Sequence, residues 1–151
     1  MKIKSFFLIF TLFLSTITFS AARPYLETLE GQKLYGSDLK GRWLLLHYWA
    51  SWCDICMGEM PEVQKFYKGM PREKAQLFLV NYDGLSKEQQ KKLLAKMGIR
   101  IPSLQGNPGR LFGIRAANAL PMTIVVNPEG KVQDVAYGPV NIKTLSSMIQ
   151  H

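Results

Sequence analysis

The stretch Trp49-Ala50-Ser51-Trp52-Cys53-Asp54-Ile55-Cys56 contains both cysteines of this 151-residue chain. It ends an apolar run, Trp43 to Trp49, that is typical of a strand buried on both faces. Apolar residues at three- and four-residue spacing follow it and predict a helix that begins near Cys53. Backbone N–H groups and the dipole at a helix start favour a thiolate. The stretch therefore predicts a reactive dithiol.

Two other uses of the cysteine pair fit the sequence less well. A disulfide between cysteines this close constrains the unfolded chain little, because stabilisation by a cross-link grows with loop length. A closed structural zinc site needs four ligands, and only His47 and His151 could join the cysteines. We therefore expect a redox function without a metal, with the disulfide itself as the redox group and no other cofactor.

Residues 1–22 have the layout of a secretory signal peptide. A basic start precedes the apolar run from Phe6 to Leu14, and small residues precede Arg23. We expect cleavage before Arg23, export to the periplasm, and a single domain at 23–151. The alternative is an uncleaved membrane anchor, because the run from Phe6 to Ala22 approaches the ~17 residues that can span a bilayer.

The chain is basic, with a formal net charge of +8 that falls to +6 when Lys2 and Lys4 are removed with the leader. Its cations are scattered among acidic and apolar residues, whereas nucleic-acid binding needs a clustered stripe with interleaved aromatics. We expect no nucleic-acid partner, and a solvated basic surface that meets acidic partners or lipid headgroups.

Patterning predicts a regular order of further elements. They are a hairpin at 25–29 and 33–35, a turn or single helical turn at 37–41, a strand at 76–82, a helix capped by Ser86, a hairpin at 121–126 and 131–137, and a helix capped by Asn141. Residues 101–113 are rich in proline and glycine and predict a loop with at most a short helix. Two apolar strands joined by a helix favour a right-handed βαβ unit.

This order of elements resembles the thioredoxin fold. Trp52-Cys53-Asp54-Ile55-Cys56 resembles its active-site signature, and Leu120-Pro121-Met122-Thr123 resembles its cis-proline loop. Glu59-Met60-Pro61 and Asn127-Pro128-Glu129-Gly130 are similar to the branch of TlpA, ResA and DsbE, which are exported, membrane-facing disulfide reductases. The resemblance covers 25–151. It implies an α/β three-layer sandwich in which helices flank a central mixed sheet, with an N-terminal β-hairpin.

The resemblance implies a protein-disulfide reductase of the cell envelope. Cys53 would attack a partner disulfide, and Cys56, one turn deeper, would resolve the mixed disulfide. Trp52 is expected to cover the active-site surface, and Leu120-Pro121-Met122 to present backbone groups to the partner. Simple packing of Trp52 and an ordinary trans Pro121 are the alternatives.

Three titratable residues are expected to tune the protonation of the dithiol. The resemblance places Glu59 near the cysteines, where a carboxylate disfavours a thiolate or accepts its proton. The alternative is an exposed glutamate that favours the helix dipole. His47 stands where thioredoxin has a buried aspartate, and is either a hydrogen-bonded core residue or a proton shuttle for Cys56. Asp54 opposes the thiolate of Cys53, which predicts a reducing protein.

Two rival functions remain. One is a disulfide oxidase or isomerase of the same fold, although the chain lacks a large helical insertion between 57 and 120. The other is a copper-binding chaperone, whose soft ligands would be Cys53, Cys56, Met57, Met60 and Met122. Methionines at helical spacing are more often core residues.

The expected partners of the dithiol are thiol- or disulfide-containing proteins of the cell envelope, together with an upstream redox donor that could be embedded in the membrane. An apocytochrome in cytochrome c maturation is one candidate substrate that the resemblance implies.

Overall fold

The computed structural model describes residues 25–115 and 117–150. The expected leader or anchor at 1–22 lies outside these residues. Within the described ranges, no helix has the length and apolar character needed to cross a bilayer.

A five-stranded mixed sheet forms the centre of the domain, in the order β5-β4-β3-β6-β7. The strands are β3 (Trp43–Trp49), β4 (Ala75–Asn81), β5 (Ser103–Leu104), β6 (Met122–Val126) and β7 (Val132–Tyr137). β3 pairs in parallel with β4 and antiparallel with β6, so the sheet is mixed as predicted. The predicted strand at 43–49 is its central strand.

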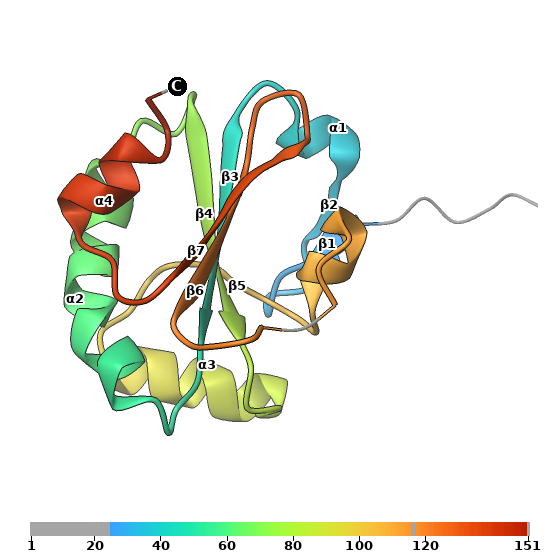
Figure 1. Ribbon diagram of the computed structural model, residues 1–151. Coiled ribbons are helices and arrows are strands. Elements are labelled where there is room, and N and C mark those ends of the chain that lie inside the picture. Colours follow the sequence, from blue (N-terminus) through green and yellow to red (C-terminus); the bar gives the residue numbers. More distant parts are fainter. Residues whose placement is uncertain (1–24, 116, 151) are drawn as a thin grey trace, which may run out of the picture.

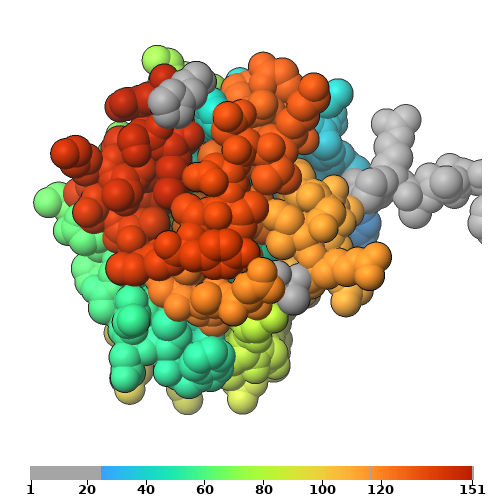
Figure 2. Space-filling view, viewed as in Figure 1, coloured from blue at the N-terminus to red at the C-terminus, as the bar shows by residue number. Residues whose placement is uncertain are grey.

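Helices and a hairpin cover the two faces of this sheet (Figure 1). The first face carries α2 (Asp54–Gly69), α3 (Lys87–Lys96) and α4 (Ile142–Ser147). The second face carries the hairpin of β1 (Tyr25–Glu27) and β2 (Lys33–Tyr35), with α1 (Gly36–Leu39) and the short 3-10 helix η1 (Pro108–Phe112). In the space-filling view, orange and red residues of the C-terminal part form much of the near surface, and green residues of α2 border them (Figure 2).

Alternation along β3 divides the core in two. Leu45 and Trp49 pack with α2 on the first face, whereas Leu44 and Leu46 pack under the hairpin on the second. Because side chains in a strand alternate between faces, His47 belongs to the α2 side. This alternation places a titratable residue beneath the helix that carries the cysteines.

Local signals account for the helix starts and for one missed strand. Ser86 accepts a hydrogen bond from the Gln89 N–H, and Asn141 accepts one from the Thr144 N–H, which confirms both predicted caps. β5 lies in the segment predicted as a loop. It is only two residues long and forms because Ser103 pairs with Leu79 of β4, a contact that local patterning does not reveal.

Candidate active site

The two cysteines are joined as a disulfide at the start of α2. Cys53 is the N-cap residue of this helix, and its Sγ accepts a hydrogen bond from the Cys56 N–H at 3.2 Å. Cys56 is fully buried, whereas Cys53 keeps 8% of its surface exposed. The sulfur that an incoming group can reach is therefore that of Cys53, and the helix start can stabilise a thiolate there.

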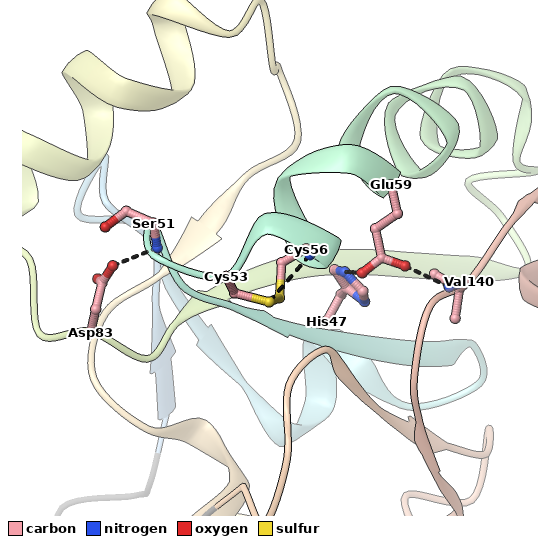
Figure 3. Close-up of a disulfide and its surroundings, with 7 residues drawn as sticks. All are labelled: His47, Ser51, Cys53, Cys56, Glu59, Asp83 and Val140. Carbon is pink, nitrogen blue, oxygen red and sulfur yellow. Dashed lines mark hydrogen bonds and ion pairs between the residues drawn. A yellow bond between two sulfur atoms is a disulfide. The ribbon is translucent and has the colours of Figure 1, made fainter.

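A tight turn carries the chain from β3 to Cys53. Its closing hydrogen bond runs from the Cys53 N–H to the Ala50 carbonyl at 3.2 Å. The Ser51 N–H, within the turn, donates to Oδ2 of Asp83 at 2.6 Å (Figure 3). Asp83 follows the end of β4, and the Tyr82 N–H binds the Trp49 carbonyl beside it. The turn from Ala50 to Cys53 is thus fixed by hydrogen bonds to the residues that follow β4.

Asp83 belongs to no motif that marks it as a site residue in the sequence. The signal for its proximity is topological, because adjacent parallel strands end at the same edge of a sheet, and Trp49 pairs with Asn81. Burial acts to raise the pKa of Asp83, but hydrogen bonds, first of all those from Ser51, outweigh it and hold the pKa below its usual value. Asp83 is therefore a carboxylate at neutral pH.

His47 and Glu59 form a buried pair behind the disulfide (Figure 3). His47 Nε2 lies 3.2 Å from Glu59 Oε1, and His47 Nδ1 lies 3.0 Å from the hydroxyl of Thr123 on β6. The second carboxylate oxygen of Glu59 accepts the N–H of Val140, which precedes α4. His47 is fully buried and Glu59 is 7% exposed. Glu59 is therefore not the exposed glutamate of the alternative interpretation.

The exposed residues next to Cys53 in the chain include two large apolar side chains and one acid. Trp52 is 66% exposed and Ile55 is 59% exposed, while Asp54 lies exposed in the first turn of α2. Trp52 is therefore not a core packing residue. Its position at the surface next to Cys53 allows it to cover the active site, and that function stays a prediction.

The Leu120–Pro121 peptide bond is cis, the geometry that the resemblance implied. Leu120 is half-buried and packs against the core group that contains both cysteines. The Pro121 carbonyl accepts the Gly138 N–H. The side chain of Met122 is fully buried on the opposite face of the sheet, so it offers no side-chain contact to a partner. A binding role for this loop remains a prediction.

The proposed soft copper ligands do not gather in one place. Met60 is fully buried on the α2 face, whereas Met122 is fully buried on the hairpin face. Across 25–115 and 117–150, no three His, Cys, Asp or Glu residues are grouped so that they could hold a metal ion. The methionines act as core residues.

Comparison with known proteins agrees with this geometry. A family model described as AhpC/TSA family matches residues 17–135. The chain is a member of the AhpC/TSA family. This chain is 31% identical over 113 residues to the thiol-disulfide oxidoreductase ResA of Bacillus subtilis, and the match covers 75% of this chain and 63% of ResA. It is 26% identical over 122 residues to the sporulation thiol-disulfide oxidoreductase A of the same organism, covering 80% and 73%.

Solved structures show the fold of this AhpC/TSA family member. StoA from Bacillus subtilis matches with a TM-score of 0.70 at 24% identity, covering 84% of this chain and 96% of that one. The exposed lipoprotein thioredoxin Etrx1 from Streptococcus pneumoniae matches with a TM-score of 0.67 at 24% identity, covering 84% and 98%. The predicted thioredoxin-like fold and the resemblance to the ResA branch are confirmed. The chain spans less than two thirds of the ResA that it matches.

Proposed function

We propose that this protein is a thiol-disulfide oxidoreductase that reduces disulfides in partner proteins. The observation that carries the proposal is the Cys53–Cys56 disulfide at the start of α2, with Cys53 the less buried cysteine. Relatives named thiol-disulfide oxidoreductases support the same reaction. The chemistry needs no cofactor, because the two sulfurs carry the two electrons.

The reaction proceeds in two exchanges. In the reduced protein, the Cys53 thiolate attacks one sulfur of the partner disulfide and forms a mixed disulfide, while the other partner sulfur leaves as a thiolate. Cys56 then loses its proton and attacks the Cys53 sulfur. The partner departs as a dithiol after taking up protons, and the protein is left with the Cys53–Cys56 disulfide. An upstream dithiol donor must reduce it again.

We propose that the His47–Glu59 pair accepts the proton of Cys56. Glu59 lies one turn beyond Cys56 on α2, and both are buried from bulk water. His47 Nδ1 faces the Thr123 hydroxyl, and His47 Nε2 faces the Glu59 carboxylate. An imidazole and a carboxylate in contact can take up one proton between them, and neither group needs solvent to receive it. The fully buried position makes direct release of the Cys56 proton to water difficult.

The pH dependence of disulfide exchange tests the proton relay. We expect His47→Asn and Glu59→Gln to slow resolution of the mixed disulfide and to move the pH profile of insulin reduction. Glu62→Gln is the matched control, because Glu62 is exposed on the same helix. Profiles of His47→Asn and Glu59→Gln that coincide with wild type would remove the relay and leave both residues as structural.

Insulin reduction with dithiothreitol as donor tests the function itself. The protein should accelerate it, and Cys53→Ser should abolish the acceleration. Equilibration with glutathione then measures the potential, which we expect to be reducing because Asp54 opposes a thiolate. A potential near about −120 mV, the value of the strong oxidant DsbA, would instead favour a disulfide oxidase.

We further propose that residues 1–22 direct export to the periplasm and that residues 23–151 work there on cell-envelope proteins. The basic start and apolar run of residues 1–22 support this proposal. A mature N-terminus at Arg23 is the expected result of sequencing the exported protein, whereas a retained N-terminus would indicate an anchor. Cys56→Ala should strand partners on Cys53, and apocytochrome c among the trapped proteins would assign the protein to cytochrome c maturation.

A further inference from the structure

The turn before Cys53 leaves one backbone donor for another group to bind. In a β-turn, the N–H of the fourth residue binds the carbonyl of the first, while the N–H of the second residue points away from the turn. Here Cys53 and Ala50 make the closing bond, and Ser51 is the second residue. Its N–H donates to Asp83, which lies just beyond the end of the neighbouring strand β4 (Figure 3). The Asp83 carboxylate therefore accepts the hydrogen bond that a water molecule would otherwise accept from Ser51.

Asp83 is also close enough to Cys53 for its charge to act on the sulfur. The carboxylate binds Ser51 directly, and the two residues from Ser51 to Cys53 span at most about 7 Å of chain. Other titratable groups on the elements around the turn are Asp54, next to Cys53, the pair His47 and Glu59 behind Cys56, and Tyr82, whose N–H binds the Trp49 carbonyl. Asp83 is the one among these that is bound to the turn itself.

We propose that Asp83 is a positioning residue for Cys53, because it fixes the turn that carries the reactive sulfur and its negative charge disfavours the thiolate there. The inference rests on the proposed reductase function. Ionisation of Cys53 releases one proton and places a second negative charge near Asp83. Because the Cys53 thiolate is less favourable beside this charge, the reduced dithiol is less stable relative to the disulfide. The reduced protein therefore passes its electrons to the partner disulfide more readily.

Asp83→Asn separates the charge from the hydrogen bond, because its amide oxygen can still accept the Ser51 N–H. In the reduced full-length protein, we expect the thiolate absorbance of Cys53 to develop at lower pH. We expect alkylation by iodoacetamide at pH 6.5 to be about two- to fourfold faster, the change for a charge roughly 10 Å away in a largely aqueous setting. Asp134→Asn on β7 is the matched control and should match wild type.

Asp83→Ala removes both the charge and the acceptor. It should show the same faster alkylation and, in addition, a lower kcat/KM for insulin, since the turn loses its contact to β4. An alkylation rate and a pH midpoint of Asp83→Asn equal to those of Asp134→Asn would overturn the proposal, and this comparison holds even if Asp83→Ala fails to fold. Alkylation needs no partner protein, so a wild type that fails to reduce insulin would reject the proposed function and leave this test intact.

Discussion

Replacing His47 or Glu59 tests whether the buried pair acts as one unit. The two residues meet at 3.2 Å with exposures of 0% and 7%, so neither side chain can be hydrated after its partner is removed. His47→Asn leaves the Glu59 carboxylate with the Val140 N–H as its remaining hydrogen bond. Glu59→Gln weakens that bond and deprives His47 of its acidic neighbour.

The expected magnitude follows from these contacts. Leaving a buried polar group without its partner costs about 1–3 kcal/mol, and more when that group is charged. A hydrogen bond to a charged acceptor, such as that from Val140, is worth about 1.5–3 kcal/mol. We expect each single variant to lose about 3 kcal/mol of unfolding free energy. The double variant should lose about 1–3 kcal/mol less than the sum, because the shared contact is lost only once.

Urea unfolding of the oxidised protein at pH 7 measures these free energies, with equal m-values as the condition for comparing the four proteins. Glu62→Gln should change the stability by less than about 0.5 kcal/mol, as exposed substitutions do. If the two single losses add to the double loss within about 0.5 kcal/mol, the residues are independent and the pair is not a unit.

Two further predictions concern Tyr48 on β3, whose hydroxyl binds Asn107 and the Gly109 N–H. A Cβ on Gly109 would lie 2.7 Å from that hydroxyl. Gly109→Ala should therefore cost about 1–3 kcal/mol in urea unfolding, whereas Gly58→Ala, with open space in α2, should be neutral or stabilising. Burial raises the pKa of Tyr48 from 10.0 to about 12. The unfolded chain thus loses this proton first, and stability should fall between these pH values. In Tyr48→Phe, the unfolding free energy should decline less steeply with pH over this range. A slope equal to that of wild type would contradict Tyr48 as the group responsible.

Much of the fold could be predicted because its signals are local. The apolar run at 43–49 is long enough to indicate a central strand, and Ser86 and Asn141 cap helices through contacts three residues away. The reactive cysteines could be predicted for the same reason, since their spacing and the following helix lie within one stretch. Glu59 and Pro121 needed the resemblance, because nothing in their immediate neighbours links them to Cys53.

The remaining contacts depend on which strands become neighbours. Asp83 reaches Ser51 only because β4 lies beside β3, and Val140 reaches Glu59 across 81 residues of sequence. Hydrophobic periodicity reports the face on which a residue lies, but not the partner that it meets there. The alternation in β3 could place His47 on the α2 side, whereas its contact with Thr123 required the register of β3 and β6.

The position of β1 determines where the dithiol lies relative to the attachment point if the chain is anchored by its N-terminal segment. Tyr25 lines a hollow together with Leu44 and Gly130, at the opposite end of β3 from Cys53 and on the face away from α2. The seven residues of β3 span about 20 Å. If the chain were held at a point before Tyr25, the dithiol would lie on the side of the domain away from the attachment point. The distance that the dithiol could reach toward partners would then depend on the length of chain before Tyr25.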